Sequence, residues 1–482
     1  MNLGIVIKVL GKLLILEALL MIPSLLIALY LGEPVIIPFA ASIALTFTTG
    51  YALSRFKSQS NRLKAKEGLS IVATGWLLAS VFGSLPFIFS GLVPSVVDAF
   101  FETVSGLTTT GATIVTDIEI LPKALLFWRS FTHWIGGMGI LVFTIALLPT
   151  LGVGGFQIFR AESPGPVTDK IVPRIKDTAK ILYVTYIALT LLEIFLLKLG
   201  GMSWYESALH TFGTVGTGGF SSRNGSIGAF DSTYIHLVIS VFMVLSGTNF
   251  ALHYALIKGK WRDVVKNPEL KLYLGIILSA TALIGFNLIL ASQVEVGLAF
   301  RDAFFQVSSI ITTTGYSTVD FDQWSTFAKA ILFVLMFIGG SSGSTGGGIK
   351  NIRILVLVKL VKREVTRIFH PRAVIPIKIG DKAAPREMVS GITSFFVLYI
   401  LIFVIGTLVI SLENISLESA ASAVAVTLGN VGPGFGSIGP TETFAGFSNF
   451  SKLFLSLLML LGRLELFTII ALIAPKAWRN EV

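Results

Sequence analysis

The sequence predicts an all-α polytopic membrane protein. In this prediction four parallel repeats, each made of a span, a short pore helix and a second span, surround a central pore. Two extra transmembrane helices precede them at the N-terminus. Three observations predict this fold class. The 482 residues are 53% hydrophobic and only 13% charged, and their mean hydropathy is +0.81. Windows of about 20 apolar residues, each long enough to cross a bilayer, occur along the chain. A Thr/Gly-rich unit recurs four times between such windows.

Ten segments have the length and composition of membrane spans. The first contains Lys8, Lys12 and Glu17 but no convincing small-residue cleavage site, so we expect a retained helix rather than a removed signal peptide. The segments are approximately 5–31, 35–54, 68–90, 122–149, 178–200, 233–257, 270–291, 325–370 with an interruption, 387–411 and 450–475.

Basic residues are concentrated in alternate loops. The most basic segment, 350–386, contains ten Lys or Arg residues, whereas the intervening loops contain only Arg223 and Arg301. The other basic loops, with five such residues each, are 54–67, 160–180 and 258–271. Because cytoplasmic loops carry the excess of Lys and Arg, we expect these loops and both termini in the cytoplasm. The net charge of +10 therefore does not require nucleic acid.

Each outside loop from the third span onward contains the same unit, in which an acidic residue opens a short helix and Thr/Gly-rich residues follow. A glycine follows the acidic residue after 13 positions in three units (98 to 111, 206 to 219, 302 to 315) and after 14 in the fourth (418 to 432). All four enter and leave on the same side, so the repeats are parallel rather than inverted. The units are "DAFFETVSGLTTTGAT" (98–113), "ESALHTFGTVGTGGFS" (206–221), "DAFFQVSSIITTTGYS" (302–317) and "ESAASAVAVTLGNVGPG" (418–434).

These repeats divide the chain into five parts. We expect an N-terminal two-helix domain at 1–60 and pore repeats at 61–160, 161–262, 263–375 and 376–482. The third repeat includes the interrupted span.

The units are too short and polar for full spans and too apolar for solvated linkers, so we expect re-entrant hairpins. A helix of about 9 residues, roughly 14 Å long, descends from outside and an extended stretch returns. Non-helical backbone is tolerated at that depth only where it is buried in protein or lines water. One TTTG stretch alone would indicate a turn between helices, but four copies with acidic openers favour hairpins around one axis.

The residue types in the unit suit a path for cations. We expect the acidic residue to cap each short helix and complement its positive end, which directs the electronegative end toward the membrane centre. Thr and Val favour an extended backbone, and glycine allows angles closed to other residues. Successive carbonyls can then replace the hydration shell of a monovalent cation.

Several separated motifs resemble the Trk/Ktr/HKT superfamily of potassium and sodium uptake proteins, and the resemblance covers essentially the whole chain. The two extra N-terminal spans make the chain most similar to the TrkH branch. The motifs are "HWIGGMGI" (133–140), "TVGTGGFS" (214–221), "TTTGYST" (312–318), "GGSSGSTGGGIK" (339–350) and "GNVGPG" (429–434).

The resemblance implies potassium uptake, because glycine at the key filter position of all four repeats accompanies potassium permeation in this superfamily. Serine at the first position accompanies sodium preference in plant relatives. The resemblance also implies a homodimer in a bacterial or archaeal cytoplasmic membrane and a cytosolic ring of TrkA-type nucleotide-binding regulatory subunits. K⁺ is then the transported ion, and the chain itself has no cofactor. The filter residues expected on this basis are Thr109, Thr110, Gly111, Thr217, Gly218, Gly219, Thr313, Thr314, Gly315, Asn430, Val431 and Gly432.

The four units differ after the key glycine, where Ala112, Phe220, Tyr316 and Pro433 stand. Proline lacks a backbone donor and fixes its own φ. An uneven filter of this kind need not select potassium as sharply as one with four identical units.

The eighth span is interrupted by ten residues with six glycines. A flexible surface linker is one interpretation, but 325–338 is too short to span and the repeat needs a span there, which favours a break inside the membrane. Lys350 follows Gly348 with one residue between, so no Walker A motif forms. In the superfamily the corresponding loop is an intramembrane gate. The resemblance assigns that role to Gly339, Gly340, Ser341, Ser342, Gly343, Ser344, Thr345, Gly346, Gly347 and Gly348.

Two charged features accompany this loop. Arg463 lies within the tenth span, where a charge usually faces a cavity, and Glu465 is a poor partner because residues two apart on a helix do not face each other. We expect Arg463 below the filter near the loop, where it repels cations. We also expect 349–370 to continue as a helix into the cytoplasm and couple the loop to the regulatory partner. Contact with anionic lipid is the alternative for this basic segment.

Other classes of function receive little support from the sequence. There is no cysteine, no HExxH or other metal-ligand spacing and no nucleophile elbow, so an intramembrane enzyme is not expected. A K⁺ symporter coupled to Na⁺ or H⁺ stays open as the alternative, since broken helices also serve transporters. Arg129 and His133, one helical turn apart, are expected to orient the first hairpin through Glu102.

Overall fold

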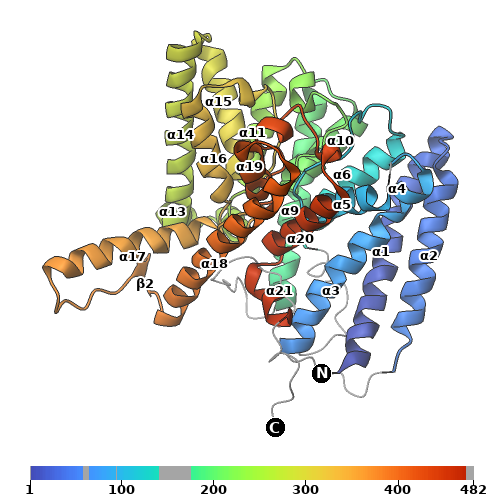
Figure 1. Cartoon of the computed structure of the whole chain (residues 1–482), viewed down its shortest axis with the longest axis horizontal. Helices are drawn as coiled ribbons and strands as arrows, with labels where there is room; N and C mark the ends of the chain where they lie inside the picture. Colours follow the sequence, from blue (N-terminus) through green and yellow to red (C-terminus); the bar gives the residue numbers. More distant parts are fainter. Residues whose placement is uncertain (1, 58–64, 94, 140–174, 381, 474–482) are drawn as a thin grey trace.

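The computed structural model describes residues 2–57, 65–93, 95–139, 175–380 and 382–473. Two long antiparallel helices, α1 (Leu3–Leu31) and α2 (Ile36–Ser54), stand at one side of the molecule (Figure 1). Their backbones approach closely at two glycines: a β-carbon on Gly11 would lie 2.6 Å from the carbonyl oxygen of Gly50. Small residues allow such packing between membrane helices.

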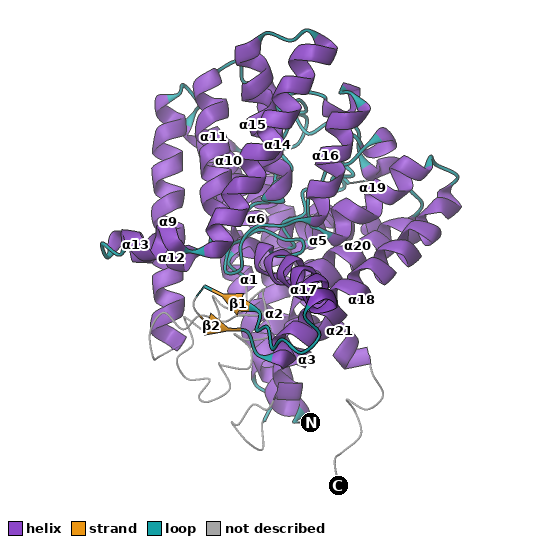
Figure 2. Cartoon of the chain, turned by 90° about the vertical axis from the view of Figure 1, so that its left-hand side faces the viewer, coloured by secondary structure: helices purple, strands orange, loops and turns teal. Residues whose placement is uncertain are grey.

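The remaining helices follow the expected order of the repeats (Figures 1 and 2). The first repeat contains α3 (Ala65–Gly83), α4 (Leu85–Ser90), α5 (Val96–Leu107) and α6 (Lys123–Gly137). The second contains α9 (Ile175–Leu199), α10 (Trp204–Val215), α11 (Thr233–Ser246) and α12 (Phe250–Ile257), and α13 (Trp261–Lys266) follows it. The third contains α14 (Pro268–Ser292), α15 (Val296–Ile311), α16 (Thr326–Phe337) and α17 (Asn351–Phe369). The fourth contains α18 (Arg386–Ile410), α19 (Leu417–Leu428), α20 (Asn449–Arg463) and α21 (Leu466–Ile473).

Short elements complete the described chain. Five 3-10 helices lie in the loops on the side of the short helices: η2 (Ser226–Ala229), η3 (Phe321–Gln323), η4 (Ser411–Glu413), η5 (Gly436–Ile438) and η6 (Phe444–Gly446). The strands β1 (Lys378–Ile379) and β2 (Lys382–Ala383) pair antiparallel beside α17, which projects sideways from the body (Figures 1 and 2). Lys359 on α17 donates a hydrogen bond to the carbonyl of Lys378, 2.7 Å away.

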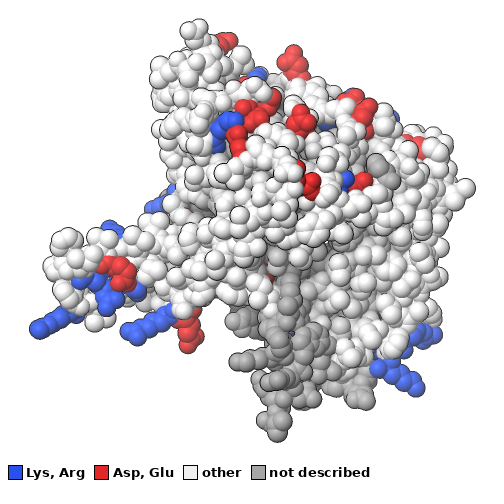
Figure 3. Space-filling model, viewed as in Figure 1, with Lys and Arg blue, Asp and Glu red and all other residues white. Residues whose placement is uncertain are grey.

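The chain is a multi-pass membrane protein, as the composition predicts. In the described part, six helices are long and apolar enough to cross a membrane, or seven if the bent pair α11–α12 is one span. Figure 3 presents a broad uncharged band between a face with acidic side chains and a lower rim and arm with basic ones. A wide band of exposed apolar side chains is suited to lipid.

Two spans that we expected to be continuous are broken. The segment 233–257 bends by 98° between α11 and α12, at Gly247, Thr248 and Asn249. The segment 450–475 breaks between α20 and α21, where Glu465 has a φ of +63°. The break in the eighth span lies between α16 and α17, as predicted. The fourth span is helical only to Gly137, and its continuation lies outside the described residues.

The short helices differ from the prediction in length and in their caps. They have 12, 12, 16 and 12 residues rather than about 9. The acidic residues do not cap them: serines cap α5, α10 and α19, and their hydroxyls accept from backbone N–H groups near the helix start. Asp98 and Glu206 stand three residues after their caps, Glu418 stands two after, and Asp302 lies inside the longer α15. An acid in the first turn still complements the positive end of the helix.

This correction explains the unequal spacing of the fourth repeat. From the first helical residue to the filter residue with left-handed backbone, the distance is 13 residues in repeat one (96 to 109), two (204 to 217) and four (417 to 430). The additional position between acid and glycine therefore arises because Glu418 stands one place earlier in its helix, and no residue is inserted in the hairpin.

Candidate ion filter and gate

All four short helices end in the same way. The next residue but one has left-handed backbone, with φ of 55°, 54°, 58° and 55° at Thr109, Thr217, Thr313 and Asn430. The following N–H group reaches back to a carbonyl five residues earlier, at distances of 2.9, 2.8, 2.8 and 2.7 Å. This is the Schellman ending, which usually places glycine at the left-handed position. A β-branched threonine there is a genuine outlier that its surroundings must enforce.

A second turn follows two residues later in every repeat. Gly111, Gly219, Gly315 and Gly432 have φ values of 80°, 80°, 83° and 103°, which side-chain-bearing residues rarely adopt. A side chain would also have no room at these positions, since a β-carbon at each glycine would collide with the backbone of another repeat. Both facts explain why glycine occupies this position four times.

The four hairpins form a closed ring. A β-carbon on Gly111 would collide with the carbonyl oxygen of Gly218, which belongs to the second repeat. The same relation joins Gly219 to Thr314, Gly315 to Val431 and Gly432 to Thr110. Each glycine therefore lies against the carbonyl that precedes the key glycine of the next repeat, and the fourth repeat returns to the first. All twelve residues expected for the filter meet in this ring.

A cavity of about 120 Å³ leads to the ring from the side where the short helices begin, and all four glycines line it. Arg223, Asn224 and Glu442 also contribute to its wall. An open cavity therefore reaches the ring from one side.

A buried network holds the first and second hairpins together. Glu102 accepts hydrogen bonds from Arg129 Nε (2.6 Å), Thr113 Oγ1 (3.0 Å) and the Ile114 N–H (3.0 Å). Arg129 in turn donates to the Ser221 carbonyl of the second repeat at 3.0 Å. Arg129 and Glu102 are both almost fully buried, and a buried charge is costly unless it is paired. Here each charge is compensated by the other and by these hydrogen bonds.

His133 links the same two hairpins. Its Nε2 accepts from the Phe220 N–H at 3.1 Å, so its Nδ1 carries the proton and donates to the Gly106 carbonyl at 2.7 Å. These contacts confirm the prediction that Arg129 and His133 orient the first hairpin, but only Arg129 acts through Glu102, whereas His133 bonds the Gly106 carbonyl directly. The second hairpin is held by the same network, which the sequence did not indicate.

The other junctions of the ring use different chemistry. Tyr316 contacts the carbonyls of His210 and Phe220 in the second repeat, each 3.0 Å from its hydroxyl. The third and fourth repeats meet where Asp322 accepts from the Gly436 N–H at 3.1 Å. The fourth and first meet through the ion pair of Lys452 with Asp98 (2.6 Å). Two of the residues after the key glycines, Tyr316 and Phe220, contact different neighbours: the guanidinium of Arg129 lies over Phe220, 3.6 Å from the centre of the phenyl ring.

The interruption of the eighth span is a folded loop beneath the ring. It is closed at its base, where the Gly339 N–H donates to the Ile349 carbonyl at 2.9 Å. Ser341 and Thr345 are 1% exposed, so the interpretation as a surface linker is wrong. Gly347 N–H donates to Thr313 Oγ1 at 2.6 Å, and Thr345 Oγ1 donates toward the Val215 carbonyl at 3.1 Å.

The loop also meets the fourth repeat. A β-carbon on Gly347 would lie 2.5 Å from the carbonyl oxygen of Gly429. The loop therefore touches the C-terminal ends of α10, α15 and α19 at once, directly below the hairpins that these helices begin.

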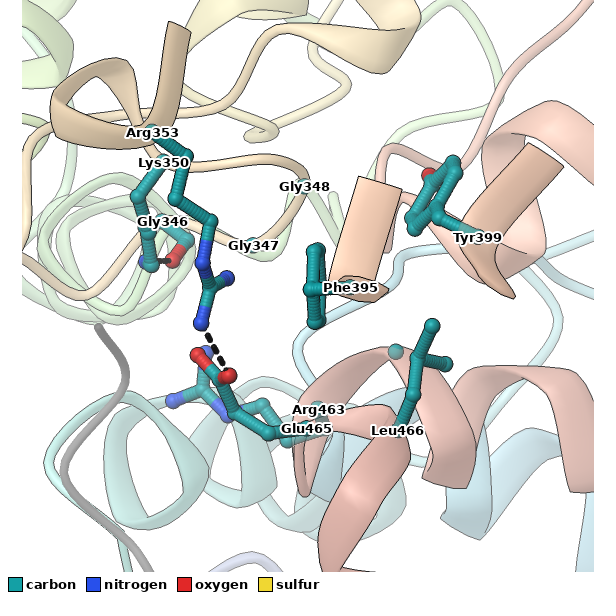
Figure 4. Close-up of a pocket in the computed structure, with 11 residues that line it drawn as sticks. Gly346, Gly347, Gly348, Lys350, Arg353, Phe395, Tyr399, Arg463, Glu465 and Leu466 are labelled. Atoms are coloured by element: carbon teal, nitrogen blue, oxygen red, sulfur yellow. Dashed lines mark hydrogen bonds and ion pairs between the residues drawn. The ribbon is translucent and has the colours of Figure 1, made fainter. Parts of the chain in front are cut away.

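Arg463 lies beside the loop, as the sequence predicts. Its guanidinium donates to the Thr345 carbonyl of the loop (2.7 Å) and to the carbonyls of Gly136 (2.5 Å) and Gly137 (3.0 Å) at the end of α6. It thereby connects the fourth repeat to the first and third beneath the ring. Glu465 forms an ion pair with Arg353 of α17 (Figure 4).

These charges line a narrow cavity of about 10 Å³ on the far side of the loop, which has room for about one water molecule. Lys350, Arg353 and Arg463 all contribute to its wall, together with Glu465 (Figure 4). Arg353 stacks on Phe395, 3.8 Å from the ring centre. The excess of positive charge disfavours a cation here while the loop is in place.

The sequence did not indicate the role of Glu269, which starts α14. This carboxylate is 6% exposed and accepts from the N–H groups of Ser342 (2.7 Å), within the loop, and Ile352 (3.0 Å), at the start of α17. An acidic residue in the first turn of a helix is ordinary, and nothing in the sequence connects it with a loop more than seventy positions later. The one feature of the sequence that could have drawn attention to Glu269 is its position at the end of a span, on the same side as the basic segment 350–386.

Four pore helices, a closed ring of glycines and carbonyls, and a buried loop below it define a membrane cation transport protein rather than an enzyme. Residues 36–480 match the model of the family described as TrkH, cation transport protein, and the chain belongs to this family. It is 39% identical to the Trk system potassium uptake protein TrkH of Halomonas elongata, with all of both chains covered. It is 41% identical to the protein of that name in Escherichia coli over 88% of each chain. The crystal structure of the potassium transporter TrkH from Vibrio parahaemolyticus superposes with a TM-score of 0.88 at 37% identity, covering 99% of this chain and all of that one.

Proposed function

We propose that this chain is a channel-like potassium uptake protein of the bacterial or archaeal cytoplasmic membrane. The closed ring, in which each key glycine lies against a carbonyl of the next repeat, is the observation that supports this function most strongly. Backbone carbonyls gathered around an axis can replace the hydration shell of a monovalent cation. The relatives are named potassium uptake proteins, which supports K⁺ as the ion.

In this proposal the carbonyl groups of the ring bind K⁺ one after another. The C-terminal ends of α5, α10, α15 and α19 point at the ring, and their partial negative charge adds to the attraction. The Schellman hydrogen bonds hold the backbone of each hairpin, so the carbonyl groups of the ring need not reorganise when an ion arrives. The unequal supports of the four hairpins fit a filter whose discrimination between K⁺ and Na⁺ is moderate.

We further propose that the loop from Gly339 to Gly348 is the gate. It lies across the inner side of the ring, bonded to Thr313 above it, and an ion cannot pass while it stays there. Arg463 holds the loop through the Thr345 carbonyl and adds positive charge below the ring. Opening then requires the loop and Arg463 to move together.

The gate is proposed to respond to a cytosolic ring of TrkA-type nucleotide-binding subunits. The helix α17 starts directly after the loop and carries Lys359, Lys362 and Arg363 on the projecting arm. Motion of that arm reaches the loop through a rigid helix. The name "Trk system" of the relatives indicates an assembly of several components. We propose that this chain forms a homodimer in that assembly, with both termini in the cytoplasm and pore repeats at the boundaries predicted above.

A symporter that couples K⁺ to Na⁺ or H⁺ is the alternative. Glu17 supports it, because this carboxyl group is 2% exposed and neither oxygen has a hydrogen-bond partner among the described residues. Unpaired acids within spans often take part in proton transfer. Glu17 lies on α1, outside the four repeats. Unitary current steps in planar bilayers distinguish the two, because a coupled carrier gives none.

Uptake of ⁸⁶Rb⁺ into liposomes that contain the purified full chain tests the proposal. We expect Gly315→Ser to reduce uptake by about tenfold or more, because serine must adopt a φ of +83° and meets the Val431 carbonyl. Gly297→Ser is the matched control, since this glycine of α15, the helix that precedes Gly315, has open space around it. Uptake by Gly315→Ser equal to that of the wild type and of Gly297→Ser, all above empty liposomes, would refute the ring as the ion path.

A further inference from the structure

The chain turns away from the direction of the spans after the bend at Gly247. Helices α11 and α12 meet at an angle of 98°, and α12 and α13 lie across the direction of the long helix α9 (Figure 2). Residues 250–266, which contain α12 and α13, are called the α12–α13 corner below. The next helix, α14, begins at Pro268 and is long and apolar enough to span a membrane. The corner therefore stands at the end of a span, on the side of the basic loops.

Basic and apolar side chains are exposed together on this corner. Ile257, Trp261 and Val265 are 74%, 57% and 59% exposed. Between residues 258 and 266 the sequence contains four basic residues and one acid. The four basic side chains are exposed, and none forms an ion pair with another described residue. They are Lys258, Lys260, Arg262 and Lys266. Tryptophan, aliphatic and basic side chains on one surface are typical of a segment at the boundary between lipid and water.

The apolar surface that suits lipid begins directly beside the corner. Lys271, near the start of α14, is exposed, and Leu274 and Leu278 further along the same helix are 38% and 67% exposed. The basic side chains of the corner therefore lie at the edge of this surface, at the level of lipid headgroups. Anionic lipid offers negative charge and apolar chains to the same patch, whereas an acidic soluble protein would leave the apolar part uncovered.

The corner begins at the gate loop. The N–H group of Phe250, the first residue of α12, donates to the Gly343 carbonyl of the loop at 3.0 Å. The Gly247 carbonyl, at the end of α11, accepts from the Ser341 N–H of the loop at 2.8 Å. The eight residues of α12, roughly 12 Å of helix, separate these bonds from the basic side chains. A ligand that fixes the corner therefore also fixes one side of the loop.

We propose that the α12–α13 corner is a docking site for anionic lipid headgroups, and that bound lipid favours the closed gate. The basic side chains attract the phosphate groups, and Trp261 and Ile257 enter the boundary of the acyl chains. Lipid bound there holds α12 where Phe250 bonds to Gly343, so it stabilises the arrangement of the loop described above. The control of the gate rests on the proposed function, whereas the binding of lipid does not.

The double variant Lys258→Gln with Arg262→Gln tests the binding of lipid. The thermal midpoint of the detergent-solubilised full chain is measured while phosphatidylglycerol or phosphatidylcholine is added. We expect phosphatidylglycerol to raise the midpoint of the wild type more than phosphatidylcholine does. In the double variant the apparent affinity for phosphatidylglycerol should be about tenfold weaker or more, because two basic side chains near an anionic surface are lost. If this variant fails to fold, Lys260→Gln with Lys266→Gln is used with the same expectations.

Arg55→Gln with Lys57→Gln is the matched control. Both residues are exposed at the end of α2, and α2 stands on the opposite side of the molecule from α13 (Figure 1). This variant removes the same number of charges from another basic loop. We expect it to keep most of the response of the thermal midpoint to phosphatidylglycerol.

Uptake of ⁸⁶Rb⁺ into liposomes tests the effect on the gate. Each variant is compared with the wild type in the same lipid, so that the surface potential is equal in both. In liposomes that contain phosphatidylglycerol, basal uptake by the corner variant should be about fivefold faster than that of the wild type, an ordinary coupling between two sites. In phosphatidylcholine alone the two should be equal. The α2 variant should equal the wild type in both lipids.

Three results would overturn the docking site. Phosphatidylglycerol and phosphatidylcholine could give the wild type the same midpoint. The corner and α2 variants could lose the response equally, which would assign it to diffuse surface charge. The corner variant could change its oligomeric state and keep its lipid response, which would assign the corner to a contact between copies of the chain.

The two proposals fail in different ways. A lipid response of the thermal midpoint without any difference in uptake supports the docking site and refutes its control of the gate. Uptake by the wild type no greater than that of empty liposomes, in both lipids, refutes the proposed function. The thermal midpoint still decides the binding of lipid in that case, because it does not depend on transport.

Discussion

The ring and the gate loop are both rich in glycine, lie in contact with each other and bury their backbone, yet they obtain their hydrogen bonds from different places. Each hairpin of the ring is fixed by Schellman bonds to its own helix. The loop instead depends on neighbours: Ser341 N–H donates to the Gly247 carbonyl at 2.8 Å, Ser342 N–H to Glu269, and Gly347 N–H to Thr313. The ring therefore has bonds within each hairpin as well as bonds between repeats, whereas the loop is joined to the body of the protein by bonds to distant segments and can leave as a unit.

Glycine also has a different purpose in the two regions. All four key glycines of the ring have positive φ, so the native backbone itself requires them. In the loop only Gly343 and Gly348 do, with φ of 74° and 65°. Gly339 and Gly347 have ordinary backbone angles and are needed only for close approach to other segments in the closed arrangement. Substitutions in the ring should therefore damage the ion path, and substitutions in the loop should damage closure.

The largest expected effect is that two alanine substitutions change ⁸⁶Rb⁺ uptake in opposite directions. Gly219→Ala, at a φ of 80° and against the Thr314 carbonyl, should lower ⁸⁶Rb⁺ uptake about tenfold or more. Gly347→Ala, against the Gly429 carbonyl, should raise basal uptake by severalfold, on the order of 1 kcal/mol of lost closure. Gly225→Ala, in the same loop as Gly219 but with ordinary space, is the control. Reduced uptake by both variants, in protein of normal stability, would remove the distinction between the regions.

Arg463→Ala should have the next largest effect. It removes three hydrogen bonds that connect the loop and α6, and it removes positive charge below the ring, so basal ⁸⁶Rb⁺ uptake without the regulatory subunits should rise about fivefold or more. Arg463→Lys keeps the charge but cannot bond the three carbonyls in the same geometry. A rise with alanine alone would assign the effect to charge, and a rise with both would assign it to the bonds. Unchanged or lower uptake by well-expressed Arg463→Ala would contradict its part in the gate.

Much of the ring was predictable from the sequence, because the same unit occurs four times between spans and only one arrangement lets four re-entrant hairpins bury each other. The composition of 339–348 likewise indicated a break that no lipid-facing helix could contain. Arg129, His133 and Glu102 were linked correctly, since a helical turn separates the first two and a buried charge needs a partner.

The rest depended on contacts that leave no local pattern. Threonine at a left-handed position is contrary to backbone preference, so Thr109, Thr217 and Thr313 were assigned extended backbone. The serine caps were hidden by the acidic residues that follow them, because either type can begin a helix. The break before α21 falls at Leu464 and Glu465, and Gly462, the glycine nearest to it, lies within α20. A bend of that kind is set by packing against neighbouring helices.

The smallest expected effect concerns Glu269, which joins the loop to the start of α17. In Glu269→Gln the amide oxygen can still accept from Ser342 and Ile352, but without the negative charge both bonds weaken. Basal ⁸⁶Rb⁺ uptake should therefore rise only about twofold to threefold, by loss of part of a charge-assisted bond. Glu269→Ala, which removes both bonds, should raise it further, and the thermal midpoint should fall in the same order.

Glu295→Gln is the control, because this acid precedes α15 and makes no side-chain cap there. Since the two N–H groups that Glu269 binds belong to the loop and to the start of α17, K⁺ affinity measured by thermal stabilisation should not weaken in either variant. A weaker K⁺ affinity with unchanged basal uptake would mean that the carboxylate supports the ring through α14, and the loop would then not be the separable region described here.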